Sequence, residues 1–552
     1  MTDLQQMTGA QVLVRALEYY SVETVFGVAG ESYLAVLDAF YDSDIRFITN
    51  RQEGCACFMA EAYAKLTGKT GVCFVTRGPG ATNGAIGVHT AKQDSTPLVY
   101  FIGQVARDQE GREAFQEIDY RDMFKPPISK AVFHLEHADD VGRVVAEAFT
   151  ISQTGRKGPV VVSLPEDMLC DMTQNVDIQP ASTAVKRDLE QDQMDQMKDV
   201  LSKAQKPVAI LGGSGWTPDI IAKFEAYAQA HSLPVVASFR RQDLFNNEHP
   251  CYVGELGTGP NPQLVSAIKD EADVVLAINT RLSEITSQGY TLFDIPDPRQ
   301  KLIHVYPDQA ELGKVYTPHA ALHMTPTDFA AQLDLLSRTY DFGDWCNTLR
   351  STYENWTRFH NSEGGFDVDM DLIFKHIREH VPEDTVFTTD AGNFSGWAQR
   401  YLKYGDGNRL LAPTSGAMGY GAPAAISASL TAPDQTVIGL MGDGGFMMCG
   451  QSLATAMMYQ ARPILIVFNN SIYGTIRMHQ ERDYPGRVVA THLHNPDFVK
   501  LAESYGAQAF KVTKTQDFYP AFEQALKSET LCLIEVQNLP EQITTTRKMS
   551  EL

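Results

Sequence analysis

The chain has 552 residues, of which 43% are hydrophobic and 21% are charged, a composition typical of a globular protein with three or four domains. Its net charge of −22, with no basic stretch to offset it, argues against a nucleic-acid partner. No apolar run reaches the roughly 20 residues that cross a bilayer, and the N-terminus lacks the pattern of a secretory signal. The eight scattered cysteines form no disulfide framework. We therefore expect a cytoplasmic enzyme without a membrane partner.

The first part of the chain, residues 1–175, alternates helical and strand patterns. Gly9–Tyr19 is expected to be a helix, and a second, Ala-rich helix is expected to follow Arg51–Gly54. Strands that alternate with helices predict a parallel, doubly wound α/β sheet. The expected strands are Thr24–Phe26, Ile45–Ile48, Gly71–Thr76, Pro97–Gly103 and Val160–Leu164.

A second α/β domain is predicted for residues 190–335, after a polar linker at about 176–190. Its first strand begins after Lys206 and runs into the turn Gly212–Gly215, which lacks the spacing of a dinucleotide fingerprint and favours a structural turn. Further strands are expected at Leu233–Ser238, Ala272–Asn279 and Lys301–Val305.

Residues 335–365 are helix-rich and aromatic-rich connectors, and a third α/β domain is predicted for residues 365–545. Its strands are expected at Thr385–Thr389, Thr436–Leu440, Ile464–Phe468 and Leu531–Val536. The predicted fold is therefore three doubly wound parallel-sheet domains, and a weak echo between the first and third suggests duplication. The close pair Cys55 and Cys57 is interpreted as packing rather than metal binding, because no second pair or histidine accompanies it.

The segment Met441–Asn470 predicts a metal–diphosphate site. It reads as strand, Gly-rich turn, amphipathic helix and second strand, with Asp443 after the first strand and Asn470 after the second. Because parallel strands end at the same edge of a sheet, the two side chains are expected to converge there. Carboxylate and amide oxygens suit Mg²⁺ or Ca²⁺, and Mg²⁺ prefers sites shared with phosphates. The glycines Gly442, Gly444 and Gly445 let backbone N–H groups approach an anion.

Gly442–Gly444 followed by Asn469-Asn470 resembles the signature of thiamine-diphosphate enzymes. The resemblance extends over nearly the whole chain and is closest to acetolactate (acetohydroxyacid) synthases and pyruvate oxidases. It implies pyrimidine-binding, central and diphosphate-binding domains, with thiamine diphosphate and Mg²⁺ as cofactors. The other matching stretches are Val25–Gly27, RQEG, VTRGPGATN, QDSTPLV, GREAFQEID, GPVVVSLPEDM and TSGAMGYGAPAA.

For the coenzyme, the resemblance implies that Glu53 hydrogen-bonds the aminopyrimidine and activates it, while Met418 bends the coenzyme. From the residues alone, Glu53 also fits a helix N-terminal acid stabilised by the helix dipole. The implied metal ligands are Asp443, Asn470 and the carbonyl of Ile472. Phosphate contacts are implied for Gly392, Asn393, Gly444 and Gly445, although the synthases usually have Gly-Gln-His and Gly-Asp-Gly-Ser at these places.

On the substrate side, the resemblance implies Phe115, Gln116 and Lys130, although Lys130 also fits an ordinary surface lysine. Tyr473–Gln480 resembles the synthase segment that closes over the site, but His479 stands where the synthases have a tryptophan that favours a larger acceptor. A second departure is Gln52 before Glu53, where a histidine is common. The acceptor, and the ligase outcome itself, therefore stay open.

The implied activity is decarboxylation of a 2-oxo acid resembling pyruvate, followed by addition to a second carbonyl. A simple 2-oxo acid decarboxylase, a 2-hydroxyacyl or hydroxyketone lyase, a catalytically silent regulatory protein and a flavin or nucleotide redox protein are the alternatives. FAD is possible but not favoured: Arg281 matches a flavin-contacting arginine, but its neighbours are only partly similar. Active sites shared between subunits are implied, and hence a homodimer or homotetramer.

Overall fold

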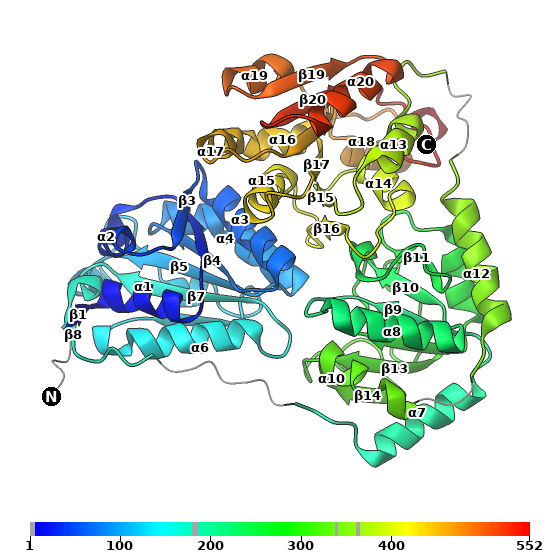
Figure 1. Ribbon diagram of the computed structural model, residues 1–552, viewed down its shortest axis with the longest axis horizontal. Coiled ribbons are helices and arrows are strands. Elements are labelled where there is room, and N and C mark those ends of the chain that lie inside the picture. Colours follow the sequence, from blue (N-terminus) through cyan, green and yellow to red (C-terminus); the bar gives the residue numbers. More distant parts are fainter. Residues whose placement is uncertain (1–5, 179–185, 337–339, 360–364) are drawn as a thin grey trace.

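The computed structural model describes residues 6–178, 186–336, 340–359 and 365–552 of the chain. In this part of the chain lie three six-stranded sheets, each built from parallel strand pairs and flanked by helices (Figure 1). The predicted fold class is therefore confirmed. No helix in the described ranges has both the length and the apolar character needed to cross a membrane.

The N-terminal domain, blue to cyan in Figure 1, has the strand order β3-β2-β4-β5-β7-β6. A short antiparallel pair, β1 (Met7–Thr8) with β8 (Met172–Thr173), lies outside this sheet. The strands are β2 (Thr24–Gly27), β3 (Arg46–Thr49), β4 (Gly71–Val75), β5 (Leu98–Gln104), β6 (Ala131–His134) and β7 (Pro159–Pro165). Its longer helices are α1 (Gly9–Tyr19), α2 (Leu34–Tyr41), α3 (Glu53–Thr67), α4 (Pro79–Asp94) and α6 (Val141–Gln153).

The central domain, green in Figure 1, has the order β11-β10-β9-β12-β13-β14, which is the strand order of dinucleotide-binding folds. The strands are β9 (Pro207–Leu211), β10 (Val235–Ser238), β11 (Tyr252–Leu256), β12 (Val274–Ile278), β13 (Lys301–Tyr306) and β14 (Ala320–His323). The main helices are α7 (Gln191–Lys203), α8 (Pro218–His231) and the connecting α12 (Gly343–Trp356).

The C-terminal domain, yellow to red in Figure 1, has the order β16-β15-β17-β18-β20-β19. Counted from the first strand of each domain, this is the same order as in the N-terminal domain, which supports the expected duplication. The strands are β15 (Val386–Thr389), β16 (Arg409–Leu411), β17 (Val437–Gly442), β18 (Ile464–Phe468), β19 (Gln508–Val512) and β20 (Cys532–Val536). The helices include α13 (Met370–His380), α14 (Ser395–Tyr401), α15 (Gly421–Thr431), α16 (Asp443–Cys449), α17 (Leu453–Met458), α18 (Gly474–Asp483), α19 (Phe498–Ser504) and α20 (Thr515–Leu526).

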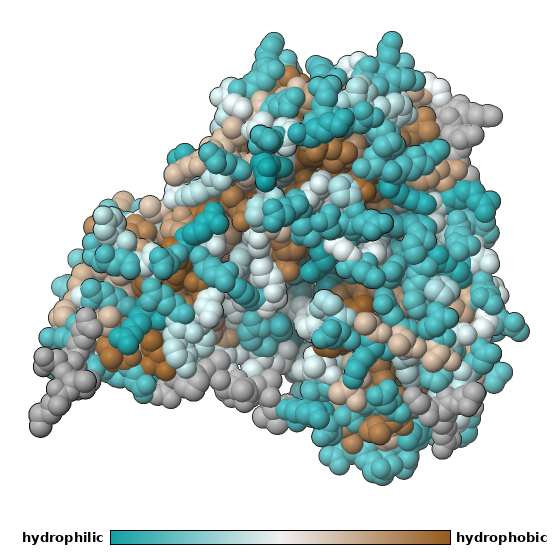
Figure 2. Space-filling model, viewed as in Figure 1, coloured by the Kyte–Doolittle hydropathy of each residue, from teal (hydrophilic) through white to brown (hydrophobic). Residues whose placement is uncertain are grey.

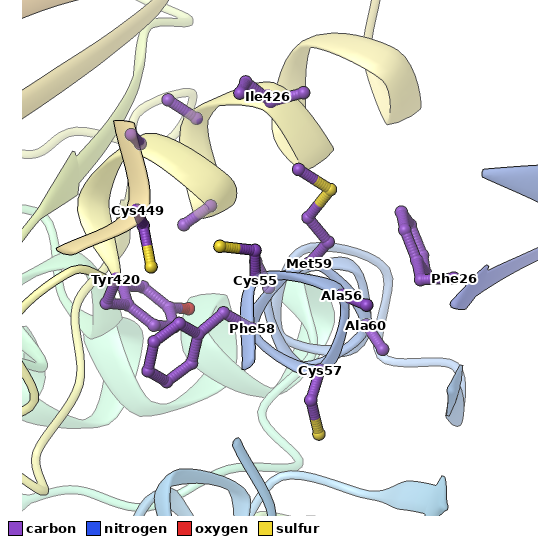
Figure 3. Packing of buried hydrophobic residues seen from close by; sticks show 14 of the residues in the cluster. Phe26, Cys55, Ala56, Cys57, Phe58, Met59, Ala60, Tyr420, Ile426 and Cys449 are labelled. Carbon is purple, nitrogen blue, oxygen red and sulfur yellow. The ribbon is translucent and has the colours of Figure 1, made fainter. Parts of the chain in front are cut away.

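One hydrophobic core joins the N-terminal and C-terminal domains through α3 and α15. Figure 3 shows the two helices packed together, and the Phe58 ring meets the Tyr420 ring edge-on at a centroid distance of 5.4 Å. The Tyr420 hydroxyl donates to the fully buried Glu61 carboxylate over 2.6 Å. Cys55 and Cys57 are free thiols buried in this core, so they serve packing as expected. This core orients the two domains relative to one another.

The central domain contains a buried acid, Glu255, at the end of β11. Burial raises the pKa of Glu255 to about 8, and its Oε2 has no hydrogen-bond partner among the described residues. The folded protein thus keeps this proton to a higher pH than the unfolded chain, whose glutamate pKa is 4.5. The stability that this group contributes is therefore present below pH 4.5 and is lost as the pH rises through about 8.

Replacing Glu255 with glutamine is expected to remove this loss, because glutamine stays neutral. The melting temperature of Glu255→Gln minus that of the wild type should increase by about 2 °C or more from pH 5.5 to pH 8.5. Thermal unfolding followed at several pH values measures the gain. Glu354→Gln, at a half-exposed side chain on α12, is the control: its melting temperature should differ from that of the wild type by the same amount at every pH. An equal effect of both substitutions would contradict the role of burial.

Candidate active site

A cavity of about 690 Å³ lies at the carboxyl edge of the C-terminal sheet, closed on one side by the central domain. The size is typical of a ligand site. The predicted metal and coenzyme residues of this domain all line it, and so does His479. They are Gly392, Asn393, Met418, Gly442, Asp443, Gly444, Gly445, Asn470, Ile472 and Tyr473.

Two neighbouring strands place Asp443 and Asn470 at this edge. β17 and β18 are parallel, and their register pairs Gly442 with Phe468, so the residues that follow each strand emerge side by side. Asp443 is buried, which raises the pKa of its carboxyl. Its Oδ1 accepts from the backbone N–H of Gly444 and its Oδ2 from that of Ser471, both over 2.9 Å. A buried carboxylate oriented in this way is a ready ligand for a cation.

The two consecutive asparagines have different roles. Asn469 is held inside the domain, because its Nδ2 donates to the Glu535 carboxylate over 2.7 Å. Asn470 lines the cavity, and its Oδ1 accepts from the Ile472 N–H over 3.2 Å. In the described ranges no group of three His, Cys, Asp or Glu side chains is placed to hold a metal ion. A cation at this edge would therefore have to use the mixed oxygens of Asp443, Asn470 and the Ile472 carbonyl, together with those of a ligand such as phosphate.

The glycines of the turn lie where no side chain fits. A Cβ at Gly445 would lie 2.1 Å from Oδ2 of Asp390, and one at Gly444 would lie 2.6 Å from the Tyr473 ring. At Gly392 the backbone φ is +155°, and a Cβ would meet the Phe394 ring at 2.7 Å. These turns leave backbone N–H groups at the wall of the cavity, which suits a diphosphate.

Residues of helix α18 line the cavity, among them Thr475, Met478 and His479. The Thr475 hydroxyl donates to Oδ1 of Asn393 over 2.8 Å, and Nδ2 of Asn393 donates to Sδ of Met478 over 3.4 Å. None of the residues of α18 is buried. α18 thus contacts the turn at Asn393 through these two side chains, and His479 also lines the cavity.

The predicted residues of the N-terminal domain form a separate group. Glu53 begins α3, and its carboxylate accepts from Nδ2 of Asn83 over 2.9 Å. It also lies beside Gly80, where an added Cβ would be 3.4 Å from Oε1 of Glu53. Gln116, at φ +67°, packs its backbone on Gly78 of the same turn. Neither Glu53 nor Gln116, nor Phe115, lines the cavity that contains Asp443. Within one chain the structure therefore divides the predicted site into two halves.

Lys130 and Phe115 lie in contrasting surroundings. Phe115 is 78% exposed. Lys130 is largely buried at the end of the N-terminal sheet, where Nζ donates to the carbonyls of Ile151 and Thr154, and burial lowers its pKa to about 8. Lys130 is thus no ordinary surface lysine, but it does not line the cavity with Asp443 either.

Two residues of the site carry no sequence signal. Asn495 follows α18 and donates to Oδ2 of Asp443 over 2.7 Å and to Oδ1 of Asn469 over 2.9 Å. Asp390 lies behind the glycine turn, where burial raises its pKa to about 6, and its Oδ1 accepts from the Gly421 N–H. The spacing of the motif identifies Asp443 and Asn470 but not these two supporting residues.

The comparisons with known proteins agree with this geometry. Three sequence profiles of thiamine pyrophosphate enzymes match: the N-terminal TPP binding domain at residues 7–123, the central domain at 194–333 and the C-terminal TPP binding domain at 390–536. The acetolactate synthase isozyme 2 large subunit of Escherichia coli is 31% identical over 96% of this chain and 95% of its own length. The acetolactate synthase large subunit of Corynebacterium glutamicum is 31% identical over 94% of this chain and 85% of its own length. The chain is therefore an enzyme of the thiamine pyrophosphate-dependent family, similar to the acetolactate synthases.

Proposed function

We propose that the protein uses thiamine diphosphate and Mg²⁺ to decarboxylate a 2-oxo acid such as pyruvate and to join the remaining fragment to a second carbonyl. Its relatives of about 31% identity are named acetolactate synthases, which supports this proposal. The observation that carries the proposal is the convergence of Asp443, Asn470 and Ile472 beside the open glycine turns in one cavity. Bound thiamine diphosphate supplies the carbon nucleophile and the electron sink that this chemistry needs.

The residues present fit a Mg²⁺–diphosphate group. Mg²⁺ prefers one or two carboxylates together with phosphate oxygens, and Asp443 is the single carboxylate among the three proposed ligands. A cation would offset the burial that raises the pKa of Asp443. The Gly444 and Gly445 backbone would approach the diphosphate, and Met418 would support the bent coenzyme from below.

Asn495 is expected to act as a positioning residue for this metal site. Its amide holds Oδ2 of Asp443, so Asn495→Ala should weaken Mg²⁺ binding by about 10-fold while leaving the fold intact. Titration of Mg²⁺ at a fixed, saturating coenzyme concentration measures the change. Asn495→Leu, which has a similar size but no donor for the carboxylate, should weaken Mg²⁺ binding too, and wild-type affinity in both variants would contradict the positioning role.

We assign Glu53 the proton transfers at the aminopyrimidine, in a homodimer that brings Glu53 of one subunit to the Asp443 cavity of the other. The separation of the two halves within one chain supports this arrangement. On the face shown in Figure 2, hydrophobic residues gather where the N-terminal and C-terminal domains meet. The large apolar side chains exposed on these domains include Leu34, Tyr41, Ile86, Phe115, Met447, Met448 and Met458, which a second subunit can cover.

For the acceptor, we place His479 over the cavity and Phe115 and Gln116 on the partner's side of the site. A histidine fills less space than the tryptophan of the synthases and can hydrogen-bond a polar acceptor. A simple decarboxylase or a lyase is the second candidate, because the same coenzyme residues serve these reactions and His479 is the departure that separates them. FAD stays possible but not favoured, since Arg281 already donates to the Gln93 carbonyl over 2.9 Å.

Product analysis tests the proposal. The protein, stripped of cofactors, receives thiamine diphosphate, Mg²⁺ and pyruvate, and CO₂, acetolactate and acetaldehyde are quantified with and without FAD. Acetolactate as the main product is expected. Acetaldehyde alone would make the protein a decarboxylase, and no CO₂ would reject pyruvate as the donor and move the search to other 2-oxo acids or to lyase substrates.

A further inference from the structure

Phe115 and Gln116 lie on a loop, residues 110–117, that we call the Phe115 loop. Its backbone is strained, because Glu113 and Gln116 have φ angles of +54° and +67°, in the left-handed region that residues with side chains rarely adopt. Within the loop, the Glu117 carboxylate accepts from two backbone N–H groups, over 2.5 and 2.9 Å. A strained segment keeps its conformation only where the surrounding structure holds it. The contacts between the loop and its domain therefore decide how well Phe115 and Gln116 are positioned.

One side chain of the N-terminal domain makes a polar contact with this loop. Nε2 of His134 lies 3.1 Å from Oε1 of Glu110. In the described ranges this is the only ion pair or hydrogen bond between the Phe115 loop and the rest of the chain, and Oε1 of Glu110 has no further partner there. Burial raises the pKa of Glu110, and the nearby His134 opposes this rise. Without His134, the carboxylate would be left partly buried and uncompensated, which is costly.

His134 is itself held by the sheet. It is the last residue of β6, and the register of β6 with β7 pairs it with Ser163. Nδ1 of His134 lies 3.2 Å from the Ser163 hydroxyl, and the His134 side chain is only 9% exposed. With a proton on Nε2, the imidazole accepts from this hydroxyl and donates toward Glu110 at the same time. His134 thus connects the rigid sheet to the Phe115 loop.

Neither packing nor another cation replaces this contact. A cavity of about 330 Å³ lies between the loop and the ends of β5, β6 and β7, so close packing does not fix the loop on this side. The other cation that lines the cavity, Arg121, already donates to Asp119 over 2.9 and 3.0 Å. Glu117 repels the Glu110 carboxylate. The position of Glu110 therefore depends on His134.

We propose that His134 is a positioning residue for substrate binding, because by holding Glu110 it keeps Phe115 and Gln116 in place at the coenzyme cavity of a second subunit. The inference rests on the proposed function, which gives these two residues to the substrate side. If a 2-oxo acid binds only where the loop is in place, its apparent affinity falls with the fraction of chains whose loop is in place. Loss of His134 should therefore raise KM and leave kcat unchanged, since every chain with bound substrate has an ordered loop.

Limited digestion with trypsin measures the position of the loop without relying on activity. Arg112 is an exposed residue of the Phe115 loop, and cleavage after it requires the loop to open, so the cleavage rate follows the open fraction. The full-length protein is saturated with thiamine diphosphate and Mg²⁺, and the cleaved bond is identified by mass spectrometry. Cleavage after Arg112 is expected to be about tenfold or more faster in His134→Leu than in the wild type. His134→Gln, which keeps an N–H donor near the position of Nε2, should stay within about threefold of the wild-type rate.

Two further variants separate the contact from general damage to the fold. Glu110→Leu changes the loop and leaves the sheet intact, and it should accelerate cleavage as His134→Leu does. The double variant should be cleaved no faster than the faster single variant, because both substitutions remove the same contact. His137→Leu, at an exposed histidine three residues beyond β6, is the matched control and should be cleaved at the wild-type rate.

Steady-state rates then test the effect on the substrate. The KM for pyruvate should be about tenfold higher in His134→Leu, with kcat and coenzyme affinity within about threefold of the wild-type values. A merely structural role would instead lower kcat through loss of folded enzyme at an unchanged KM. If pyruvate is no substrate of the wild type, the proposed function fails, and the digestion still decides whether His134 holds the loop.

Four results would overturn the proposal. They are wild-type cleavage in His134→Leu, equal acceleration in His137→Leu, cleavage of His134→Gln as fast as that of His134→Leu, and an unchanged KM in a variant whose loop is cleaved faster.

Discussion

Asp443→Ala is expected to weaken Mg²⁺-dependent binding of thiamine diphosphate by about 100-fold, or about 2.8 kcal/mol. The substitution removes the only carboxylate of the proposed metal site and the acceptor of the Gly444 N–H, whereas the Ser471 N–H and the Asn495 amide keep only Oδ1 of Asn469 as acceptor. Titration of the coenzyme at a fixed Mg²⁺ concentration measures the change. Asp434→Ala, in an exposed loop of the same domain, is the control and should bind as the wild type does.

Asp443→Asn separates the charge from the hydrogen bonds. Its amide oxygen can still accept from the Ser471 N–H and the Asn495 amide, and only the Gly444 N–H loses its acceptor, so the turn is expected largely to keep its shape while the attraction for a cation falls. We therefore expect weakened Mg²⁺-dependent coenzyme binding with a nearly unchanged melting temperature. Wild-type coenzyme affinity in both Asp443 variants would reject Asp443 as a metal ligand.

The interior of each sheet was predictable from the sequence because buried parallel strands are continuous apolar runs. β4, β5, β17 and β18 are buried along nearly their whole length, and each was expected within two residues of its observed bounds. In the three six-stranded sheets, the strands that escaped prediction all lie at sheet edges: β6, β11, β14, β16 and β19; the short pair β1 and β8 was not predicted either. Most of these edge strands are short and partly exposed, as in β19, where only Val512 is buried, so no apolar run marks them. β11 is buried throughout, but Gly254 and Glu255 interrupt its apolar run.

Some residues of the candidate site could likewise be predicted from the sequence, and others could not. Asp443 and Asn470 could be paired from sequence because both follow strong strands of one parallel unit, and the cavity contains both. Asn495 and Asp390 could not, because a supporting hydrogen bond has no fixed spacing along the chain. Lys130 was ambiguous for a related reason, since only the fold reveals that two backbone carbonyls hold its ammonium group.

Glu53→Gln is expected to lower kcat by about 100-fold or more while leaving coenzyme affinity within about threefold of the wild-type value. Glutamine has the same shape, and its carbonyl can still accept from Nδ2 of Asn83, which lies 2.9 Å from the carboxylate, but it cannot take up and return a proton. Steady-state rates and coenzyme titration measure the two quantities separately. Glu147→Gln, on the exposed side of α6, is the control. An undiminished kcat in Glu53→Gln would reject the proton-transfer role.

Mixing the two inactive proteins tests the shared site directly. If Glu53 of one subunit serves the Asp443 cavity of its partner, a dimer of one Glu53→Gln chain and one Asp443→Ala chain contains one site with both residues intact. Equal, fully exchanged mixtures should then recover about a quarter of wild-type activity, because half of the dimers are mixed and each has one working site. If both residues served a site within one chain, no mixture could restore activity, because every chain would carry a defect. Recovery of activity is therefore expected because, within a single chain, Glu53 does not line the cavity that contains Asp443.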